Sequence, residues 1–347
     1  MPGTNSTPPR GADVALAAGV SQKTVSRVFR GESYVSDAVR ARVMAAAEEL
    51  GYRINSAARA LASGRTHTVG TVALESDLFG PTSLLVGIER AARNAGFALQ
   101  IAITSDGEEG GIRRAVDALL ERGVDGIIVA EAIDEDSGVI AVDVPVLVFG
   151  GTARFESPLL VGVDIGSRSV VAHAVTRLLD LGHPTVHHLA GPANWVSSKE
   201  RLAGWRDAVE SRGAAAPEVF LGDWSAASGF ICGREVAARD DVSAVFAAND
   251  EMAIGLIHAL RESGRSVPGD VSVMGFDDIP LAAHVDPPLT TIRQDLGLFA
   301  IEAVAEFIVV IEGGQPRPNP VARMPVELIE RSSTGPPNSK RQAGLKQ

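Results

Sequence analysis

The feature that most limits the fold of this chain is a regular alternation of short apolar runs with longer amphipathic segments, beginning at Thr68. Runs such as TVGTVAL and DGIIVAE have the length and composition of buried strands, whereas residues 83–95 and 113–121 have the spacing of helices. A second series begins near Gly166, with helices expected at 168–180, 201–211 and 251–262. Such alternation builds parallel sheets covered by helices on both faces. We therefore expect an α/β body of two doubly wound parallel-sheet lobes, with a ligand cleft between the carboxyl ends of their strands.

The first 65 residues have a different pattern. Ala15, Gly19 and Val25 follow the A-x3-G-x5-V spacing of a helix-turn-helix, in which a small residue lies where two helices cross and glycine makes the turn. We expect helices at about 13–18, at about 21–30, and from a Ser36 cap to Leu50, where Gly51 ends the third. The sequence thus predicts an all-α helix-turn-helix headpiece at residues 11–54.

The second of these helices has a polar face of the kind that contacts DNA. Ser21 is a good N-cap, and Val25 and Val28 face inward. The outward side chains are suited to base edges and phosphates in a major groove, and they are Gln22, Lys23, Ser26 and Arg27. The alternative is an ordinary surface helix. The spacing, the cap and the position at the start of a long acidic chain favour a recognition helix.

Charge is unevenly distributed along the chain. The net charge is −11, which argues against a protein that coats nucleic acid along its whole surface. Residues 1–65 nevertheless carry nine Lys and Arg against five Asp and Glu, a net +4, which leaves −15 for the remainder. A basic head on an acidic body is typical of a DNA-binding module attached to a domain that does not touch DNA.

Several classes of protein are disfavoured. The single cysteine, Cys232, rules out an intrachain disulfide and argues against a cysteine-based metal site, and we expect no cofactor. The chain shows neither a signal peptide nor a membrane-spanning run, which indicates a cytoplasmic protein. His187 and His188 are adjacent on a predicted strand and face opposite sides, so they cannot act together on one substrate. No phosphate loop or nucleophile elbow is present, and we expect no enzyme.

Residues 55–66, NSAARALASGRT, form a short Ala-rich helix and a Gly-containing linker. One interpretation is a plain tether. The other is a hinge helix that places Leu61 in a minor groove, where a leucine can wedge apart a base step and bend the duplex.

The order of these parts resembles the LacI/GalR family of bacterial transcriptional repressors from about Asp13 to Glu330. The strings that carry the resemblance are DVALAAGVSQKTVSRV, YVSDAVRARVMAAAEELGYRINSAARAL, GIERAARNAGF, ERLAGW, ANDEMAIG, VSVMGFDDIP and PPLTTIRQD. The resemblance implies a body similar to periplasmic sugar-binding proteins, at residues 67–331. Lobe 1 is expected at about 67–164 and 295–325, and lobe 2 at about 165–293. Residues 1–10 and 332–347 are polar and expected to be disordered.

The function that the resemblance implies is a homodimeric or tetrameric repressor of sugar-utilisation genes. It would bind double-stranded operator DNA and leave it when a sugar closes the cleft. Two alternatives stay open: a sugar-binding protein of the periplasmic type without a DNA role, and a regulator that uses a non-sugar corepressor such as a purine.

The resemblance also assigns residues to DNA. Gln22 and Lys23 match base-reading positions, and Leu61 matches a hinge leucine that intercalates at the operator centre, which favours the wedge. The full set matched to DNA contacts is Ser21, Gln22, Lys23, Thr24, Ser26, Arg27, Asn55, Ala58 and Leu61.

The cleft residues implied by the resemblance are of the types that bind a polyol. The segment GDWSAASGF is very similar to that of galactoside-binding members, in which the Trp stacks on a sugar ring. From the residues alone, Trp224 is equally consistent with a structural role, Asn249 with a helix cap, and Asp277–Asp278 with a strand-end turn. The predicted set is Leu78, Phe79, Pro81, Glu131, Arg201, Trp224, Asn249, Asp277 and Gln294.

The chain departs from the family pattern at several positions. Ala130 and Gly150 stand where galactoside-binding members have polar residues, although Glu131 is placed to compensate. Arg10–Gly11 replaces the usual Thr-Ile before the first helix, which weakens one phosphate contact and a helix start. Ile165 replaces the usual Asn after Asp164.

Overall fold

The computed structural model describes residues 9–29, 34–52, 60, 64–105, 108–130, 138–150, 155–163, 167–315 and 326–338. The chain divides into two compact units, Met1–Thr66 and His67–Gln347, and each is described by itself. Within the described ranges, no helix is both long enough and apolar enough to cross a membrane.

The first unit is a bundle of three helices, α1 (Gly11–Ala17), α2 (Gln22–Phe29) and α3 (Asp37–Glu49). Ala15 and Val25 are buried in its core, and Gly19 has a φ of +63°, so the predicted spacing folds as a helix-turn-helix. The weak helix start at Arg10–Gly11 is offset locally, because the Arg10 backbone N–H donates to the Asp13 carboxylate at 2.7 Å.

The predicted caps of this unit differ in outcome. Ser21 caps α2, since its Oγ accepts the Thr24 backbone N–H at 3.1 Å. Ser36 occupies the N-cap position of α3 but its side chain makes no capping hydrogen bond. Leu50, the predicted last residue of this helix, follows α3 as its C-cap and is 39% exposed. Gly51, with a φ of +63°, ends the helix as predicted.

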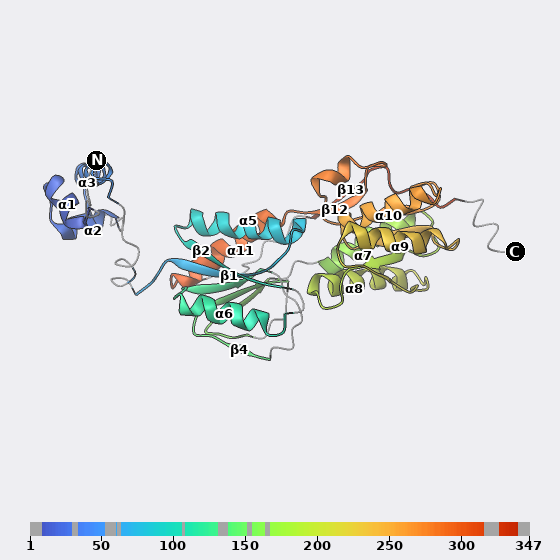
Figure 1. Cartoon of the computed structure of the whole chain (residues 1–347), viewed down its shortest axis with the longest axis horizontal. Helices are drawn as coiled ribbons and strands as arrows, with labels where there is room; N and C mark the ends of the chain where they lie inside the picture. Colours follow the sequence, from blue (N-terminus) through green and yellow to red (C-terminus); the bar gives the residue numbers. More distant parts are fainter. Residues whose placement is uncertain are drawn as a thin grey trace, which may run out of the picture. The chain divides into compact units, whose positions relative to one another are not determined.

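Lobe 1 of the second unit is a five-stranded parallel sheet with the strand order β2-β1-β3-β5-β7. Helices α5 and α11 cover one face and α6 the other (Figure 1). A short parallel pair, β4 (Ile140–Ala141) and β6 (Phe155–Glu156), lies outside this sheet. The elements of the lobe are β1 (Thr68–Leu74), α5 (Phe79–Asn94), β2 (Ala98–Thr104), α6 (Gly111–Glu121), β3 (Gly126–Val129), β5 (Val146–Phe149), β7 (Leu160–Val163) and α11 (Leu296–Ile311).

Alternation along β1 explains why both faces of this sheet are covered. Val69 and Ala73 pack under α5 and α11, whereas Val72 and Leu74 pack under α6. Helices α5 and α11 approach closely at Gly87, where a Cβ would lie 2.6 Å from the Gly297 carbonyl oxygen. The C-terminal helix α11 therefore completes the core of a lobe that begins far earlier in the chain.

Lobe 2 is a four-stranded parallel sheet with the order β11-β10-β8-β9. Helices α7 and α8 pack on one face, and α9 and α10 on the other. The elements are α7 (Ser167–Asp180), β8 (His187–Ala190), α8 (Val196–Ser211), β9 (Phe220–Leu221), α9 (Ala226–Ala237), β10 (Ala244–Ala247), α10 (Asp250–Glu262), β11 (Ser272–Met274) and the 3-10 turn η1 (Pro280–Ala283).

The chain leaves lobe 2 through β12 (Thr291–Gln294), which runs directly into α11 of lobe 1 and pairs antiparallel with β13 (Val326–Ile329). The expected disorder from residue 332 is wrong for its first part. Ser333 is fully buried; its Oγ donates to the Val273 carbonyl at 2.6 Å and accepts the Thr290 N–H at 2.7 Å. Residues 339–347 lie outside the described ranges.

Candidate ligand cleft and nucleic-acid interface

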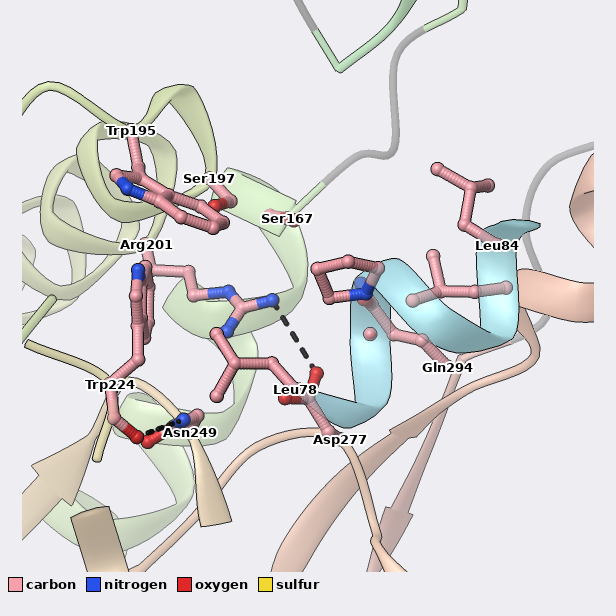
Figure 2. A pocket seen from close by; sticks show the side chains of 13 residues that line it. Leu78, Leu84, Ser167, Trp195, Ser197, Arg201, Trp224, Asn249, Asp277 and Gln294 are labelled. Carbon is pink, nitrogen blue, oxygen red and sulfur yellow. Dashed lines mark hydrogen bonds and ion pairs between the residues drawn. The ribbon is translucent and has the colours of Figure 1, made fainter. Parts of the chain in front are cut away.

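A pocket lies where the carboxyl ends of the lobe 2 strands meet the start of α5 and the crossover strand β12. Polar groups come from lobe 2 and β12, and an apolar wall comes from lobe 1 (Figure 2). The lining side chains are Leu78, Pro81, Leu84, Ser167, Trp195, Ser197, Arg201, Trp224, Asn249, Asp277, Gln294 and Leu296, with Gly80 contributing backbone.

Arg201 lies at the centre of this pocket and is 8% exposed. It projects from α8, and its guanidinium carbon lies 3.8 Å from the Phe276 ring centroid and 5.6 Å from that of Trp224. One Nη donates to the Ala248 carbonyl, and the other lies 3.5 Å from Asp277 Oδ1. Stacking on two rings holds the guanidinium plane, so Arg201 presents its donors in a fixed direction.

Asp277 is the acidic partner of Arg201 and is 8% exposed. It follows β11, and its backbone N–H donates to the Ile292 carbonyl of β12 at 2.7 Å. Burial raises the pKa of Asp277 to about 7, with the Arg201 charge opposing and Glu251 reinforcing that rise. With a pKa near 7, this carboxyl group can be ionised or protonated at neutral pH. The ionised form accepts hydrogen bonds from a hydroxylated ligand, and the protonated form can also donate one.

Trp224 forms one side of the pocket and is 4% exposed. Its φ of +75° is unusual for a bulky residue, and Asn249 Nδ2 supports that backbone by donating to the Trp224 carbonyl at 2.9 Å. Gly191 leaves room for the indole, because a Cβ there would collide with the ring. Trp195 meets Trp224 edge to face, with ring centroids 5.6 Å apart.

Three residues of the pocket carry buried polar atoms without a hydrogen-bond partner in the described structure. These atoms are Arg201 Nε, Trp224 Nε1, and both Oε1 and Nε2 of Gln294. A buried donor or acceptor without a partner costs about 1–3 kcal/mol. Their gathering around one pocket indicates a place that a polar ligand or water completes.

The pocket combines two chemistries. Indole faces and the wall of Leu78, Pro81 and Leu296 suit C–H surface, while guanidinium, carboxylate and amide groups suit hydroxyls. A sugar ring presents both, because its faces are apolar and its rim is hydroxylated. The pocket can therefore bind a neutral polyol ring.

Seven predicted cleft residues lie together in this pocket: Leu78, Pro81, Arg201, Trp224, Asn249, Asp277 and Gln294. Phe79 does not; it lines an adjoining groove with Glu251, Asp278 and Pro280, and this groove shares Asp277, Gln294 and Leu296 with the pocket. Glu131 lies outside the described residues. Ala130 and Gly150 stand at the two positions where galactoside-binding members of the family have polar residues. Ala130 is buried and Gly150 is half-buried.

Sequence reasoning missed Trp195, Ser197, Ser167, Leu84 and Leu296. Trp195 and Ser197 lie in the segment between β8 and Arg201, at the carboxyl end of a predicted strand. Their position after that strand was a usable signal, because ligands bind at the carboxyl ends of such sheets.

Asn249 and Asp277 also have the structural roles considered from the sequence, a helix cap and a strand-end turn. Asn249 caps α10, since its Oδ1 accepts the Met252 N–H at 3.0 Å. Asp277 and Asp278 do form a turn after β11, with φ of +108° and +51°. Both therefore shape the pocket as well as line it.

His187 and His188 face opposite sides of β8, as expected. His187 lies 6.2 Å from the Phe220 ring centroid, whereas His188 stacks between Trp205 and Phe246 at 5.4 and 5.2 Å. Burial lowers the pKa of each to about 4. They are neutral core histidines, and neither lines the pocket.

The first unit presents the predicted DNA-contacting side chains on α2. Gln22, Lys23 and Ser26 are exposed, while Thr24 and Arg27 are half-buried. The Arg27 guanidinium lies 5.1 Å from the Tyr34 ring centroid. Ser21 Oγ already caps the helix, so its side chain has a structural role. Asn55, Ala58 and Leu61 lie outside the described residues.

Comparison with known families gives two matches. Residues 12–55 match the model described as bacterial regulatory proteins, lacI family, and residues 175–334 match a periplasmic binding protein-like domain. The first match covers the helix-turn-helix, and the second runs from within α7 of lobe 2 through β12, α11 and β13.

Individual relatives extend the similarity to nearly the whole chain. The lactose operon repressor of Escherichia coli (strain K12) is 34% identical over 94% of this chain and 91% of its own length. The crystal structure of the Lac repressor dimer bound to operator and the anti-inducer ONPF has a TM-score of 0.76 at 29% identity, covering 95% of this chain and 100% of that chain. A complex of the transcriptional regulator CelR with cellobiose has a TM-score of 0.66 at 33% identity, covering 94% and 99%.

Proposed function

Because this chain belongs to the LacI family of bacterial regulatory proteins, we propose that it is a transcriptional repressor whose hold on operator DNA is controlled by a glycoside bound in the cleft. Its relatives are transcriptional regulators. We propose equally that it acts in the cytoplasm, as a homodimer, and catalyses no reaction.

The observation that carries the ligand class is the set of unpartnered polar atoms around one pocket. Arg201 Nε and Trp224 Nε1 are donors, and the Gln294 amide both donates and accepts. Hydroxyl groups can satisfy all of them, because each hydroxyl both donates and accepts. A ligand without hydrogen-bonding groups leaves them unsatisfied.

The residues divide the work of binding. Trp224 stacks on a ring face, and Arg201 with Asp277 binds hydroxyls at the rim. Gln294 binds from the crossover strand β12, so a ligand that touches it links lobe 2 to the strand that leads into lobe 1. Such a ligand favours the conformation in which the lobes are closed around it.

On the DNA side, α2 is proposed as the recognition helix. Its exposed Gln22 and Lys23 read base edges, and Thr24, Ser26 and Arg27 contribute phosphate and further base contacts. Two copies in a dimer occupy half-sites about 34–36 Å apart along the duplex. The Escherichia coli ribose operon repressor is also a relative, so ribose is included in the test below, together with a purine as the non-sugar alternative.

The direct test is a thermal-shift screen of the purified protein with galactose, lactose, cellobiose, ONPG, ribose and hypoxanthine, run in parallel on Trp224→Ala. We expect a glycoside to raise the unfolding midpoint of the wild type and to have little effect on the variant, since loss of stacking weakens binding. Stabilisation by hypoxanthine alone, or equal stabilisation of both proteins by the sugars, contradicts the proposal.

A further inference from the structure

The turn of Asp277 and Asp278 needs support from its surroundings. Both residues have positive φ, +108° and +51°, and neither is glycine. Asp277 faces Arg201 in the pocket and also lines the adjoining groove, whereas Asp278 lines the groove alone. The conformation of this turn therefore decides where the Asp277 carboxylate points.

Two arginines hold the Asp278 carboxylate. Arg293 Nε lies 2.7 Å from Oδ2, and Arg331 Nη2 lies 2.6 Å from Oδ1. The Asp278 side chain is only 6% exposed, and that of Arg331 is 16% exposed. Hydrogen bonds between charged groups are short and directional, so the two arginines fix the orientation of the carboxylate from both sides.

The two arginines arrive from separate segments of the chain. Arg293 belongs to β12, and its neighbour Gln294 lines the pocket on the other face of that strand. Arg331 follows β13; its Nη1 donates to the Leu289 carbonyl at 2.7 Å and its N–H to Thr290 Oγ1 at 2.9 Å. Through these two arginines, the crossover strand and the C-terminal segment are both joined to the turn of Asp277 and Asp278.

The peptide groups on either side of Asp278 are anchored independently. Asp277 N–H donates to the Ile292 carbonyl at 2.7 Å, and Ile279 N–H donates to Asp250 Oδ2 at 2.9 Å. These two amides report on the turn, because opening it exposes both to solvent exchange.

We propose that Arg331 and Arg293 are positioning residues of the ligand site, which act through Asp278 to hold Asp277 toward Arg201 and the ligand. The proposal rests on the proposed function in that Asp277 is taken to bind the ligand. Neither arginine lines the pocket with Arg201, so their effect on binding is indirect. Arg331 has the larger role, because the Arg293 side chain is 50% exposed and screened by water.

The first test is hydrogen–deuterium exchange of the full-length protein at the Asp277 and Ile279 amides. Arg331→Met removes the charge and keeps the aliphatic stem, and we expect exchange about tenfold faster there, with a smaller increase for Arg293→Met. Arg331→Lys restores part of the protection. The control is Arg177→Met, which removes an exposed 2.8 Å pair with Glu330, next to Arg331 in the chain, and leaves exchange at the turn unchanged.

The second test is the dissociation constant of ONPG and of cellobiose by calorimetry. For the glycoside that binds the wild type, we expect the dissociation constant to be about tenfold higher for Arg331→Met. Arg331→Lys should recover part of the affinity, and Arg177→Met should bind like the wild type. Unchanged exchange at the turn overturns the proposal. Faster exchange throughout lobe 2, or faster exchange at the turn with an unchanged dissociation constant, shows a merely structural role and overturns it too. If neither these two nor the other sugars of the thermal-shift screen bind the wild type, the proposed function fails, and the exchange rates alone support or overturn the role of Arg331.

Discussion

At the scale of single residues, the pocket is built around two buried groups of different charge behaviour. The Asp277 carboxyl group has a raised pKa, whereas the Arg201 guanidinium stays charged. Asp277 is buried and its pKa is raised to about 7, while Arg201 is fixed by Phe276 and Trp224. The sequence predicted these residues individually. Trp195 was not among the predicted residues, although its position just after a predicted strand was a signal for the ligand site.

The raised pKa of Asp277 predicts a pH-dependent stability. An aspartate with a higher pKa in the folded than in the unfolded state stabilises the fold at low pH, and that contribution is lost as the pH rises from about 3.8 to about 7. Relative to Asp277→Asn, the wild type should lose about 2 kcal/mol of unfolding free energy between pH 5 and pH 7.5. Urea unfolding of both proteins measures the difference, and parallel pH profiles would show that Asp277 ionises normally.

Gly191 is predicted to control the position of Trp224. Gly191→Ala directs a methyl group into the indole, and we expect a loss of about 1–3 kcal/mol of stability together with weaker glycoside binding. Gly162→Ala is the control, since a Cβ at Gly162 in β7 meets no atom within 4 Å. Thermal unfolding and calorimetric titration are the measurements. Equal behaviour of the two variants would contradict the packing of Trp224 against Gly191.

At the scale of helices and strands, alternation of apolar runs predicted the sheets well: the bounds of β1 are those of the run TVGTVAL, and β3 lies within the run DGIIVAE. Helix starts were less predictable. Helix α5 begins at Phe79 and α8 at Val196, earlier than expected, because Leu78 and Trp195 occupy the N-cap positions and give no polar capping signal.

The resemblance placed residues 295–325 in lobe 1, but the helix and strand of this region were not predicted, because their partners are distant in sequence. Helix α11, LGLFAIEAVAEFIVVI, is buried against the lobe 1 sheet and lacks a clear polar face. The segment around Ser333 has the composition of a disordered tail, yet it is ordered by hydrogen bonds to Val273 and Thr290. Composition alone cannot reveal such contacts.

Ser333→Ala tests whether this segment is part of the fold. The substitution leaves the buried Thr290 N–H and Val273 carbonyl without a side-chain partner, and we expect a loss of about 1–3 kcal/mol of unfolding free energy. Ser332→Ala, at an exposed neighbour, should cost much less. Chemical denaturation of both variants gives the comparison, and a neutral Ser333→Ala would mean that the segment is dispensable.

Helix α2 carries a separate prediction about DNA. Gln22→Ala should relax the preference at one base pair of each half-site by about 1–3 kcal/mol, because an exposed amide at the helix start reads a base edge. Met44→Ala, at an exposed neutral position on α3, is the control. Selection from randomised duplexes followed by sequencing measures the preference. An unchanged selected sequence for Gln22→Ala would remove Gln22 from base recognition.

At the scale of the whole molecule, the chain joins a small basic DNA-binding unit to an acidic α/β unit whose pocket is suited to a polyol. Ligand binding and DNA binding are then linked, and each must alter the affinity for the other by the same factor. A coupling of about 1–3 kcal/mol corresponds to a 5- to 150-fold change in operator affinity.

Coupling between the pocket and DNA is measured by fluorescence anisotropy of a labelled duplex, chosen by selection on the full-length protein, as glycoside is added. We expect the glycoside that stabilises the wild type to weaken its affinity for the duplex at least fivefold, and to leave the complex with Trp224→Ala intact. A duplex held equally tightly with and without the bound glycoside, or released equally from both proteins, would contradict control of DNA binding through this pocket.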